Sequence, residues 1–230
     1  MSKEKKYNIN KYMKSVVHVK TRFMFYMPVL GGEIVEKYFL KLGTGFIIDK
    51  KNNTYYILTA SHVVTHNNIL IMAHLKDIKV NGDRATIVSN YIAEDFAVLK
   101  IKTNKKYPIM NLCSQCVEGQ PAWLIGHPGG KREDKFVVTG HVAYRSEKKL
   151  YFDGNGLKGM SGAPMINKNG DAIGVIIDFF SEKEKFIGCI PIKMIEYYIR
   201  RDILMDQWIV KLAKFLKWKT VNVEKLFQKK

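Results

Sequence analysis

Strand-length apolar runs, each bounded by turn-forming residues, repeat along most of this sequence. They begin near residue 15, end near residue 192, and are rich in Val, Ile, Tyr and Phe. The segments between them carry turn chemistry such as Asn81-Gly82 and the stretch 168–170. About a dozen strands over roughly 180 residues favour two six-stranded barrels over one. We therefore predict an all-β chain with one antiparallel β-barrel over 15–108 and a second over 109–192.

Both ends of the chain lack this repeated pattern of strand-length apolar runs. Residues 1–14 are rich in Lys, and we expect them to form a loose basic arm. From about residue 193 the apolar period becomes helical, which predicts an amphipathic C-terminal extension over 193–230. Its apolar residues, which recur at three- and four-residue steps, are Ile195, Tyr198, Ile199, Ile203, Leu204, Trp208, Leu212, Phe215 and Leu216. Docking of this face onto the barrels is the favoured interpretation, and a partner or membrane-surface helix is the alternative.

The charge of the chain is strongly positive, at +17 from 38 basic and 21 acidic residues. Such a balance attracts nucleic acid and anionic membranes without specificity, so contacts of this kind through the basic arms are one expectation. Lys and Ile are also frequent throughout the chain, so part of the excess reflects composition. The sequence leaves the oligomeric state open.

Neither a secretion signal nor a membrane span is evident. No window approaches eighteen consecutive apolar residues, and no apolar segment follows the charged start. The three cysteines, Cys113, Cys116 and Cys189, are too few for a disulfide framework. We therefore expect an intracellular, cytoplasmic protein, without a metal site or a cofactor.

One glycine-rich stretch surrounds a single serine. Residues 154–164, GNGLKGMSGAP, contain four glycines, a proline and Ser161. A serine nucleophile needs a base, a group that orients the base, and donors for an oxyanion. Gly159 and Gly162 allow a tight turn in which the amides of Gly159 and Ser161 converge on one oxygen. An ordinary glycine-rich turn with an exposed serine is the alternative for this stretch taken alone.

The partners of Ser161 must come from elsewhere in the chain. His62 ends an apolar run beside the small residues Ala60 and Ser61, which leave room around its ring. Asp95 stands immediately before a continuous apolar strand, where an unpaired charge is costly. Glu94 would point to the opposite face and is the weaker choice. The other histidines are His18, His66, His74, His127 and His141.

Six segments occur in the order and spacing of a known family. They are GTGFIID at 43–49, ILTASHVV at 57–64, EDFAVLKI at 94–101, IGHPGG at 125–130, GMSGAPMIN at 159–167 and GDAIGVI at 170–176. Together they resemble the trypsin-like (chymotrypsin-fold) serine proteases, and most closely the protease domain of the Deg/HtrA-type branch. The resemblance covers about residues 15–196 and implies a chymotrypsin-like pair of β-barrels.

By this resemblance, three residues form a catalytic triad. His62 matches the general base, Asp95 the orienting acid and Ser161 the nucleophile, while Gly159 and Ser161 would supply the oxyanion hole. The chain order His, Asp, Ser is that of chymotrypsin and differs from the subtilisin and α/β-hydrolase orders. The implied function is a serine endopeptidase that hydrolyses peptide bonds through an acyl-enzyme, with a protein or peptide as substrate.

The sequence also departs from the family at several positions. Met160 stands where trypsin has an Asp that pairs with a new N-terminus, so activation by N-terminal processing is not expected. Ala163 replaces a usual Gly, and Phe96 replaces a usual Leu or Ile. The roughly 35 residues after the resemblance are too few for the PDZ domain of the Deg/HtrA-type branch. We therefore expect no PDZ domain.

The resemblance to trypsin-like proteases also implies which residues form the specificity pocket. Its residues would be Asn155, Ile176, Ile177, Asp178 and Phe179. Asn155 in place of Asp disfavours selection of Lys or Arg, and the Ile and Phe residues favour an apolar or small side chain. Asp178, or His141 from a neighbouring strand, could reverse that preference.

Two other functions are compatible with the sequence. A protease that cuts itself or a polyprotein, as compact viral members of the fold do, is one. A protease fold without activity, used as a binding module through the basic arms, is the other. The presence of all three triad residue types at matching motifs favours the enzyme.

Overall fold

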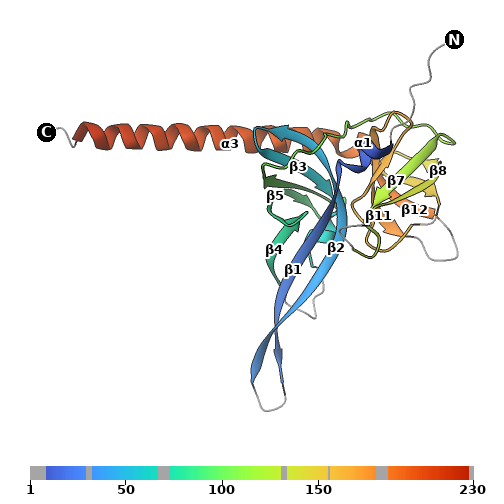
Figure 1. Ribbon diagram of the computed structural model, residues 1–230, viewed down its shortest axis with the longest axis horizontal. Coiled ribbons are helices and arrows are strands. Elements are labelled where there is room, and N and C mark those ends of the chain that lie inside the picture. Colours follow the sequence, from blue (N-terminus) through green and yellow to red (C-terminus); the bar gives the residue numbers. More distant parts are fainter. Residues whose placement is uncertain are drawn as a thin grey trace, which may run out of the picture. The chain divides into compact units, whose positions relative to one another are not determined.

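The computed structural model describes residues 9–29, 33–66, 73–130, 134–154, 156–179 and 186–227. Within this described part, the strands form two closed antiparallel β-barrels of six strands each (Figure 1). The predicted fold class is therefore confirmed. No helix in the described residues has the length and apolar character to cross a membrane.

The first barrel closes in the order β1-β2-β3-β6-β5-β4. Its strands are β1 (Val16–Pro28), β2 (Ile34–Lys51), β3 (Thr54–Thr59), β4 (His74–Val80), β5 (Asp83–Tyr91) and β6 (Phe96–Lys102). Alternate side chains fill the interior, where Val19, Ile57 and Leu99 are fully buried. The predicted turn at Asn81-Gly82 joins β4 to β5, and both residues have positive φ, 48° and 89°, as a two-residue hairpin turn requires.

The second barrel closes in the order β10-β11-β12-β9-β8-β7. Its strands are β7 (Pro121–Gly126), β8 (Phe136–Arg145), β9 (Leu150–Asp153), β10 (Pro164–Ile166), β11 (Ala172–Phe179) and β12 (Phe186–Pro191). Leu124, Phe152 and Met165 are fully buried in its separate core. The connecting segment bonds to both barrels, because Met110 N–H donates to a carbonyl of β2 and Cys113 N–H to one of β11.

The N-terminal segment is more ordered than the predicted loose arm. Its first eight residues lie outside the described part, but Ile9–Met13 form the short helix α1. The Tyr12 hydroxyl donates to Asn169 O at 2.7 Å, and Lys135 Nζ donates to Met13 O at 2.7 Å. The prediction was wrong for residues 9–13 because these tertiary contacts, which carry no local sequence signal, hold the segment on the second barrel.

The predicted C-terminal helix is present. Helix α3 (Ile192–Phe227) follows β12 directly and begins one residue before the predicted start. Ile192 and Ile195 in its first turns are fully buried.

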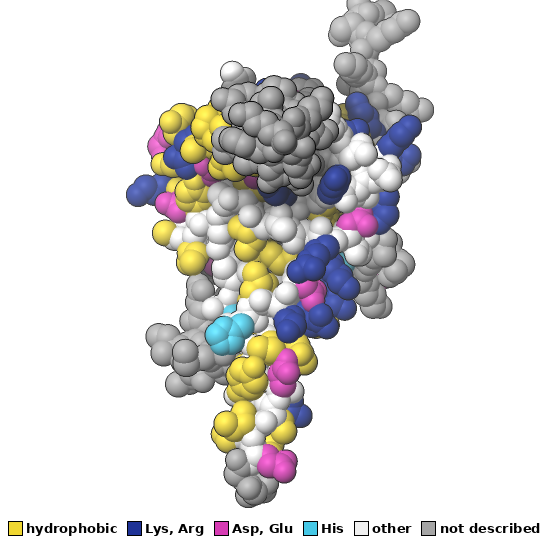
Figure 2. Space-filling model, turned by 90° about the vertical axis from the view of Figure 1, so that its left-hand side faces the viewer, with side chains coloured by type: hydrophobic (Ala, Val, Ile, Leu, Met, Phe, Trp, Pro, Cys, Tyr) yellow, Lys and Arg dark blue, Asp and Glu magenta, His cyan; other side chains and the backbone are white. Residues whose placement is uncertain are grey.

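Strands β1 and β2 extend beyond the first barrel as a two-stranded ribbon (Figure 1). Strand β1 pairs with β4 only as far as Met24, whereas its pairing with β2 continues to Pro28 opposite Ile34. Figure 2 shows hydrophobic side chains along this ribbon and a group of Lys and Arg side chains beside its base. Tyr26, Ile34 and Tyr38 are among the exposed residues of the ribbon.

Candidate active site

His62 lies on a single helical turn that follows β3. The last residue of that strand, Thr59, donates its hydroxyl to Thr44 O at 2.7 Å and so ties the strand end to β2. Ala60 continues in extended backbone, and α2 (Ser61–Val64) then carries His62. The His62 side chain keeps 41% of its surface exposed, so a bound molecule can reach the ring.

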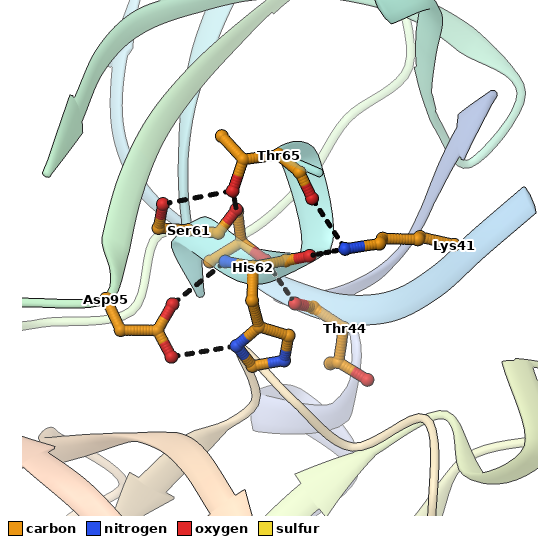
Figure 3. A network of polar contacts seen from close by, with 7 residues as sticks. Lys41, Thr44, Ser61, His62, Thr65 and Asp95 are labelled. Carbon is orange, nitrogen blue, oxygen red and sulfur yellow. Dashed lines mark hydrogen bonds and ion pairs between the residues drawn. The ribbon is translucent and has the colours of Figure 1, made fainter. Parts of the chain in front are cut away.

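Asp95 binds His62 through both carboxylate oxygens (Figure 3). Asp95 Oδ1 accepts the backbone N–H of His62, and Oδ2 contacts His62 Nδ1, each at 2.8 Å. The carbonyl oxygen of Asp95 also accepts the Ser61 N–H at 3.2 Å. Asp95 has a φ of 57°, in the left-handed region that Asp tolerates better than most residues. Asp95 therefore fixes both the backbone and the ring of His62.

This contact determines which ring nitrogen is available for chemistry. An ionised carboxylate only accepts hydrogen bonds, so Asp95 Oδ2 selects the tautomer with its proton on His62 Nδ1. His62 Nε2 is then the unprotonated nitrogen, and it can accept a proton from a hydroxyl. The half-buried pair therefore has the chemistry of a general base with an orienting acid.

Ser161 lies in the tight turn between β9 and β10. Gly159 and Gly162 have φ values of 96° and 83°, which residues other than glycine rarely adopt. Ser161 O accepts the Thr44 N–H of β2 at 2.8 Å, and the Gly162 N–H donates to Ile176 O of β11 at 2.7 Å. The turn is thus bonded to both barrels.

The carbonyl before Gly159 is held by a second turn. In η1 (Pro128–Gly130), the Gly129 N–H donates to Lys158 O at 2.6 Å. The carbonyl and the following N–H point in opposite directions across a trans peptide. The Gly159 N–H therefore points away from Gly129.

The amide of Ser161 is oriented in the same manner. Met160 O accepts the Ala163 N–H at 2.9 Å, which turns the following Ser161 N–H to the opposite side. Among the described residues, neither the Gly159 N–H nor the Ser161 N–H donates a backbone hydrogen bond. Both amides are therefore free to donate to a bound oxygen.

The Ser161 turn and the α2 turn adjoin across β2. A methyl group placed on Gly43 of β2 would lie 2.6 Å from Val63 Cγ2 and 3.1 Å from Ser161 O. A methyl group on Gly162 would lie 2.8 Å from Ala60 N, just before α2. Glycine at these two positions allows the close approach of the two turns.

The segments that form these turns match one known protein family. A family model described as the trypsin-like peptidase domain matches residues 43–175, which is more than half of the chain. The chain belongs to the trypsin-like peptidase family. The resemblance to trypsin-like proteases found in the sequence is therefore confirmed.

Solved structures show the same trypsin-like fold. The HtrA-type protease AlgW with a decapeptide superposes with a TM-score of 0.66 at 21% identity, over 85% of this chain and 66% of that chain. A variant of AlgW with a decapeptide gives a TM-score of 0.65 at 21% identity, over 81% of this chain and 62% of that chain. This chain therefore spans slightly less than two thirds of their length.

Glycine at position 162 is required by space as well as by φ. A Cβ on Gly162 would lie 2.2 Å from Thr44 O and 2.4 Å from Thr59 Oγ1. We expect Gly162→Ala to lower the free energy of unfolding by at least about 2 kcal/mol, measured by urea denaturation. Gly119→Ala is the matched control, because Gly119 has a φ of 77° but nothing within 4 Å of its Cβ position. Equal losses in the two variants would contradict the role assigned to close approach.

The predicted specificity residues lie in different surroundings. Asn155 lies outside the described residues, as does the side chain of Phe179 at the end of β11. Ile176 is fully buried in the second core, while Ile177 packs against the core of the first barrel. Asp178 is exposed. Their assignment to a substrate pocket stays a prediction.

His141, the other residue considered for that pocket, pairs with a carboxylate. It lies on β8 opposite Asp153 of β9, and His141 Nδ1 is 3.6 Å from Asp153 Oδ2. The backbone N–H of His141 donates to the same carboxylate. Both side chains are largely exposed.

The four remaining histidines differ in burial and in their ring contacts. His18 and His127 are buried, with ring centroids 5.6 Å apart. The His66 ring packs edge-on against Phe39 at 4.8 Å. His74 is exposed at the start of β4.

The cysteines form no disulfide and are largely buried. Cys116 and Cys189 are buried and Cys113 is half-buried. Burial raises the pKa of the Cys189 thiol far above its usual range, so this thiol stays protonated and unreactive. In the described residues, no three His, Cys, Asp or Glu side chains gather as a metal-binding group.

Sequence reasoning missed two residues that hold the site together. Thr44 Oγ1 donates to Gly159 O at 2.9 Å and accepts the His127 N–H at 2.9 Å, so the buried Thr44 of β2 contacts both the Ser161 turn and the residue that follows β7. Lys41 Nζ bonds the carbonyls at the end of the His62 turn (Figure 3). The threonine of GTGFIID could have indicated the first contact, but no motif indicates the second.

Proposed function

We propose that this chain is a serine endopeptidase whose catalytic triad is Ser161, His62 and Asp95. The observation that carries the proposal is the double contact of Asp95 with the backbone N–H and Nδ1 of His62. This arrangement leaves His62 Nε2 available as a base, on a turn that adjoins the Ser161 turn across β2. Membership of the trypsin-like peptidase family supports the same function.

The reaction follows from the roles of these groups. Ser161 Oγ attacks the carbonyl carbon of a peptide bond while His62 Nε2 takes the hydroxyl proton. The negative oxygen of the tetrahedral intermediate is stabilised by the N–H groups of Gly159 and Ser161. His62 then donates the proton to the leaving amine, the C–N bond breaks, and an acyl-enzyme remains. Water, deprotonated by His62, releases the acid and restores Ser161.

The substrate class is a protein or peptide. The decapeptide in the AlgW structures belongs to that protease, and its presence there supports a protein or peptide as the substrate class of this chain. Hydrogen bonds from the two amides to the oxyanion lower the barrier of the chemical step, because donors held by the fold need no reorganisation as the charge develops.

Covalent labelling tests this proposal directly. A fluorophosphonate probe reacts with a serine only where a base activates the hydroxyl, so we expect one labelled peptide, containing Ser161, in peptide mapping by mass spectrometry. His62→Ala should abolish the label. Ser114→Ala, which removes an exposed serine, should label like the parent protein. A folded sample that takes up no label would overturn the proposal.

A further inference from the structure

The α2 turn that carries His62 depends on support from outside itself. A single helical turn is costly to nucleate and leaves its last carbonyls without partners inside the helix. Thr65 caps the turn partly, because its N–H and its hydroxyl both donate to Ser61 O, at 3.0 Å and 2.8 Å. The carbonyls of His62 and Thr65 take their hydrogen bonds from another element.

Lys41 of β2 supplies those hydrogen bonds. Its ammonium donates to His62 O at 3.0 Å and to Thr65 O at 2.6 Å, across 21 and 24 residues of sequence (Figure 3). The side chain is half-buried, and its Nζ lies 5.8 Å from the centre of the Phe23 ring. One side chain of the barrel wall thus binds the carbonyl end of the turn.

The surroundings of Lys41 are unusual for a lysine. Burial lowers the pKa of its ammonium, and the charge of Asp95 opposes that effect. Among the described residues, no carboxylate forms an ion pair with Lys41. The charge is stabilised instead by carbonyl oxygens at the negative end of a helical turn. Such a partly desolvated cation is unfavourable unless it holds its hydrogen bonds.

The two ends of α2 are held by opposite charges. At the amide end, the Asp95 carboxylate accepts the His62 N–H and the Asp95 backbone carbonyl accepts the Ser61 N–H, while the Lys41 ammonium binds the carbonyl end. We propose that Lys41 is a positioning residue for His62, which fixes the backbone from which the imidazole reaches the serine hydroxyl. This inference rests on the proposed role of His62 as general base.

A positioning role differs from a purely structural one in what it changes. A structural tie would affect the unfolding temperature and leave the folded enzyme's kcat unchanged. A positioning residue acts on the transition state, so its loss lowers kcat and kcat/KM together with little change in KM. Removal of a cation near a base that becomes protonated does not by itself slow the reaction. A fall in kcat would therefore report geometry.

The experiment compares three variants of the full chain. Lys41→Met keeps the length and apolar stem but removes the ammonium. Lys41→Arg keeps the charge and offers several N–H donors to the two carbonyls. Lys105→Met is the control, because Lys105 Nζ also bonds a carbonyl, Asn81 O, and the Asp83 carboxylate, in the same barrel but away from α2.

Two readouts are needed, one of which does not depend on activity. Proton NMR detects the hydrogen-bonded proton between His62 Nδ1 and Asp95 as a resonance far downfield, and steady-state kinetics gives kcat and KM on a dye-labelled unfolded protein. We expect Lys41→Met to shift or broaden that resonance and to lower kcat by about 10- to 100-fold, with KM within about twofold. Lys41→Arg should recover most of the parent's resonance and kcat, and Lys105→Met should leave both the resonance and kcat unchanged.

The outcomes separate this inference from the proposed function. A folded Lys41→Met protein with the parent's resonance and kcat would overturn the positioning role, even if Ser161 labels normally. If Lys41→Met does not fold, Lys41→Gln, which also removes the ammonium, takes its place, and a folded Lys41→Gln protein with the parent's resonance and kcat would overturn the positioning role as well. If the parent protein shows no labelling at Ser161, the proposed function fails, while a resonance altered in Lys41→Met still supports the positioning of His62.

Discussion

Replacing Ser161 by Ala is expected to lower kcat on a peptide or protein substrate by about 10⁶-fold. The substitution removes only the side-chain hydroxyl. The hydrogen bond from the Thr44 N–H to Ser161 O joins backbone atoms, so the substitution does not remove it. The turn, its glycines and the oxyanion amides should therefore persist. Binding of substrate should persist too, so the loss should appear in kcat with KM little changed.

The kcat and KM of freshly purified Ser161→Ala are measured with a dye-labelled unfolded protein as the substrate. The unfolding temperature of Ser161→Ala should lie within about 2 °C of the parent's, which shows that the loss is chemical. Ser114→Ala serves as the matched control for loss of one serine hydroxyl. A Ser161→Ala protein that retains a tenth of the parent's activity would show that another residue is the nucleophile.

Replacing Asp95 by Asn is expected to lower kcat by about 10⁴-fold at neutral pH. The amide is nearly the same size as the carboxylate, and its oxygen can still accept the His62 N–H at the position of Asp95 Oδ1. Its NH₂ group then faces His62 Nδ1 and donates to it. The ring must place its proton on Nε2, so the nitrogen that should take the Ser161 proton is already occupied.

Fluorophosphonate labelling rates and kcat should fall together in Asp95→Asn, because both depend on His62 as base. The control is Asp83→Asn, which removes the carboxylate paired with Lys105 in the same barrel. We expect that change to leave the labelling rate within about twofold, since surface ion pairs contribute little. Equal labelling of Asp95→Asn and Asp83→Asn would show that Asp95 does not orient the base.

Much of the fold was predictable because its signals are local. The strands of these barrels are short runs rich in β-branched and other apolar residues, so segments such as Phe96–Lys102 show strand length and composition directly. The Asn81-Gly82 turn was visible for the same reason, since positive φ at two adjacent positions selects those residues. Short-range rules of this kind need no knowledge of the rest of the chain.

The contacts that assemble the site were harder to predict. The approach of Lys41 to the carbonyls of His62 and Thr65 joins a side chain to backbone atoms, and backbone carbonyls look alike at every position in a sequence. The order in residues 9–13 has the same origin, because it depends on the Tyr12 contact with Asn169. The positive φ of Asp95 was also invisible, since Asp serves equally in ordinary backbone.

The outer part of the β1–β2 ribbon has consequences for how chains of this kind can diverge. Beyond Met24, residues of β1 pair only with β2, from Phe25 opposite Lys37 to Pro28 opposite Ile34. Equal numbers of residues can therefore be added to or lost from both strands without a change in barrel closure or in the turns that carry His62 and Ser161. Because successive side chains alternate between faces, such changes preserve the pattern when they come in steps of two per strand. The ribbon is thus a segment whose length and surface can evolve independently of the turns that carry His62 and Ser161.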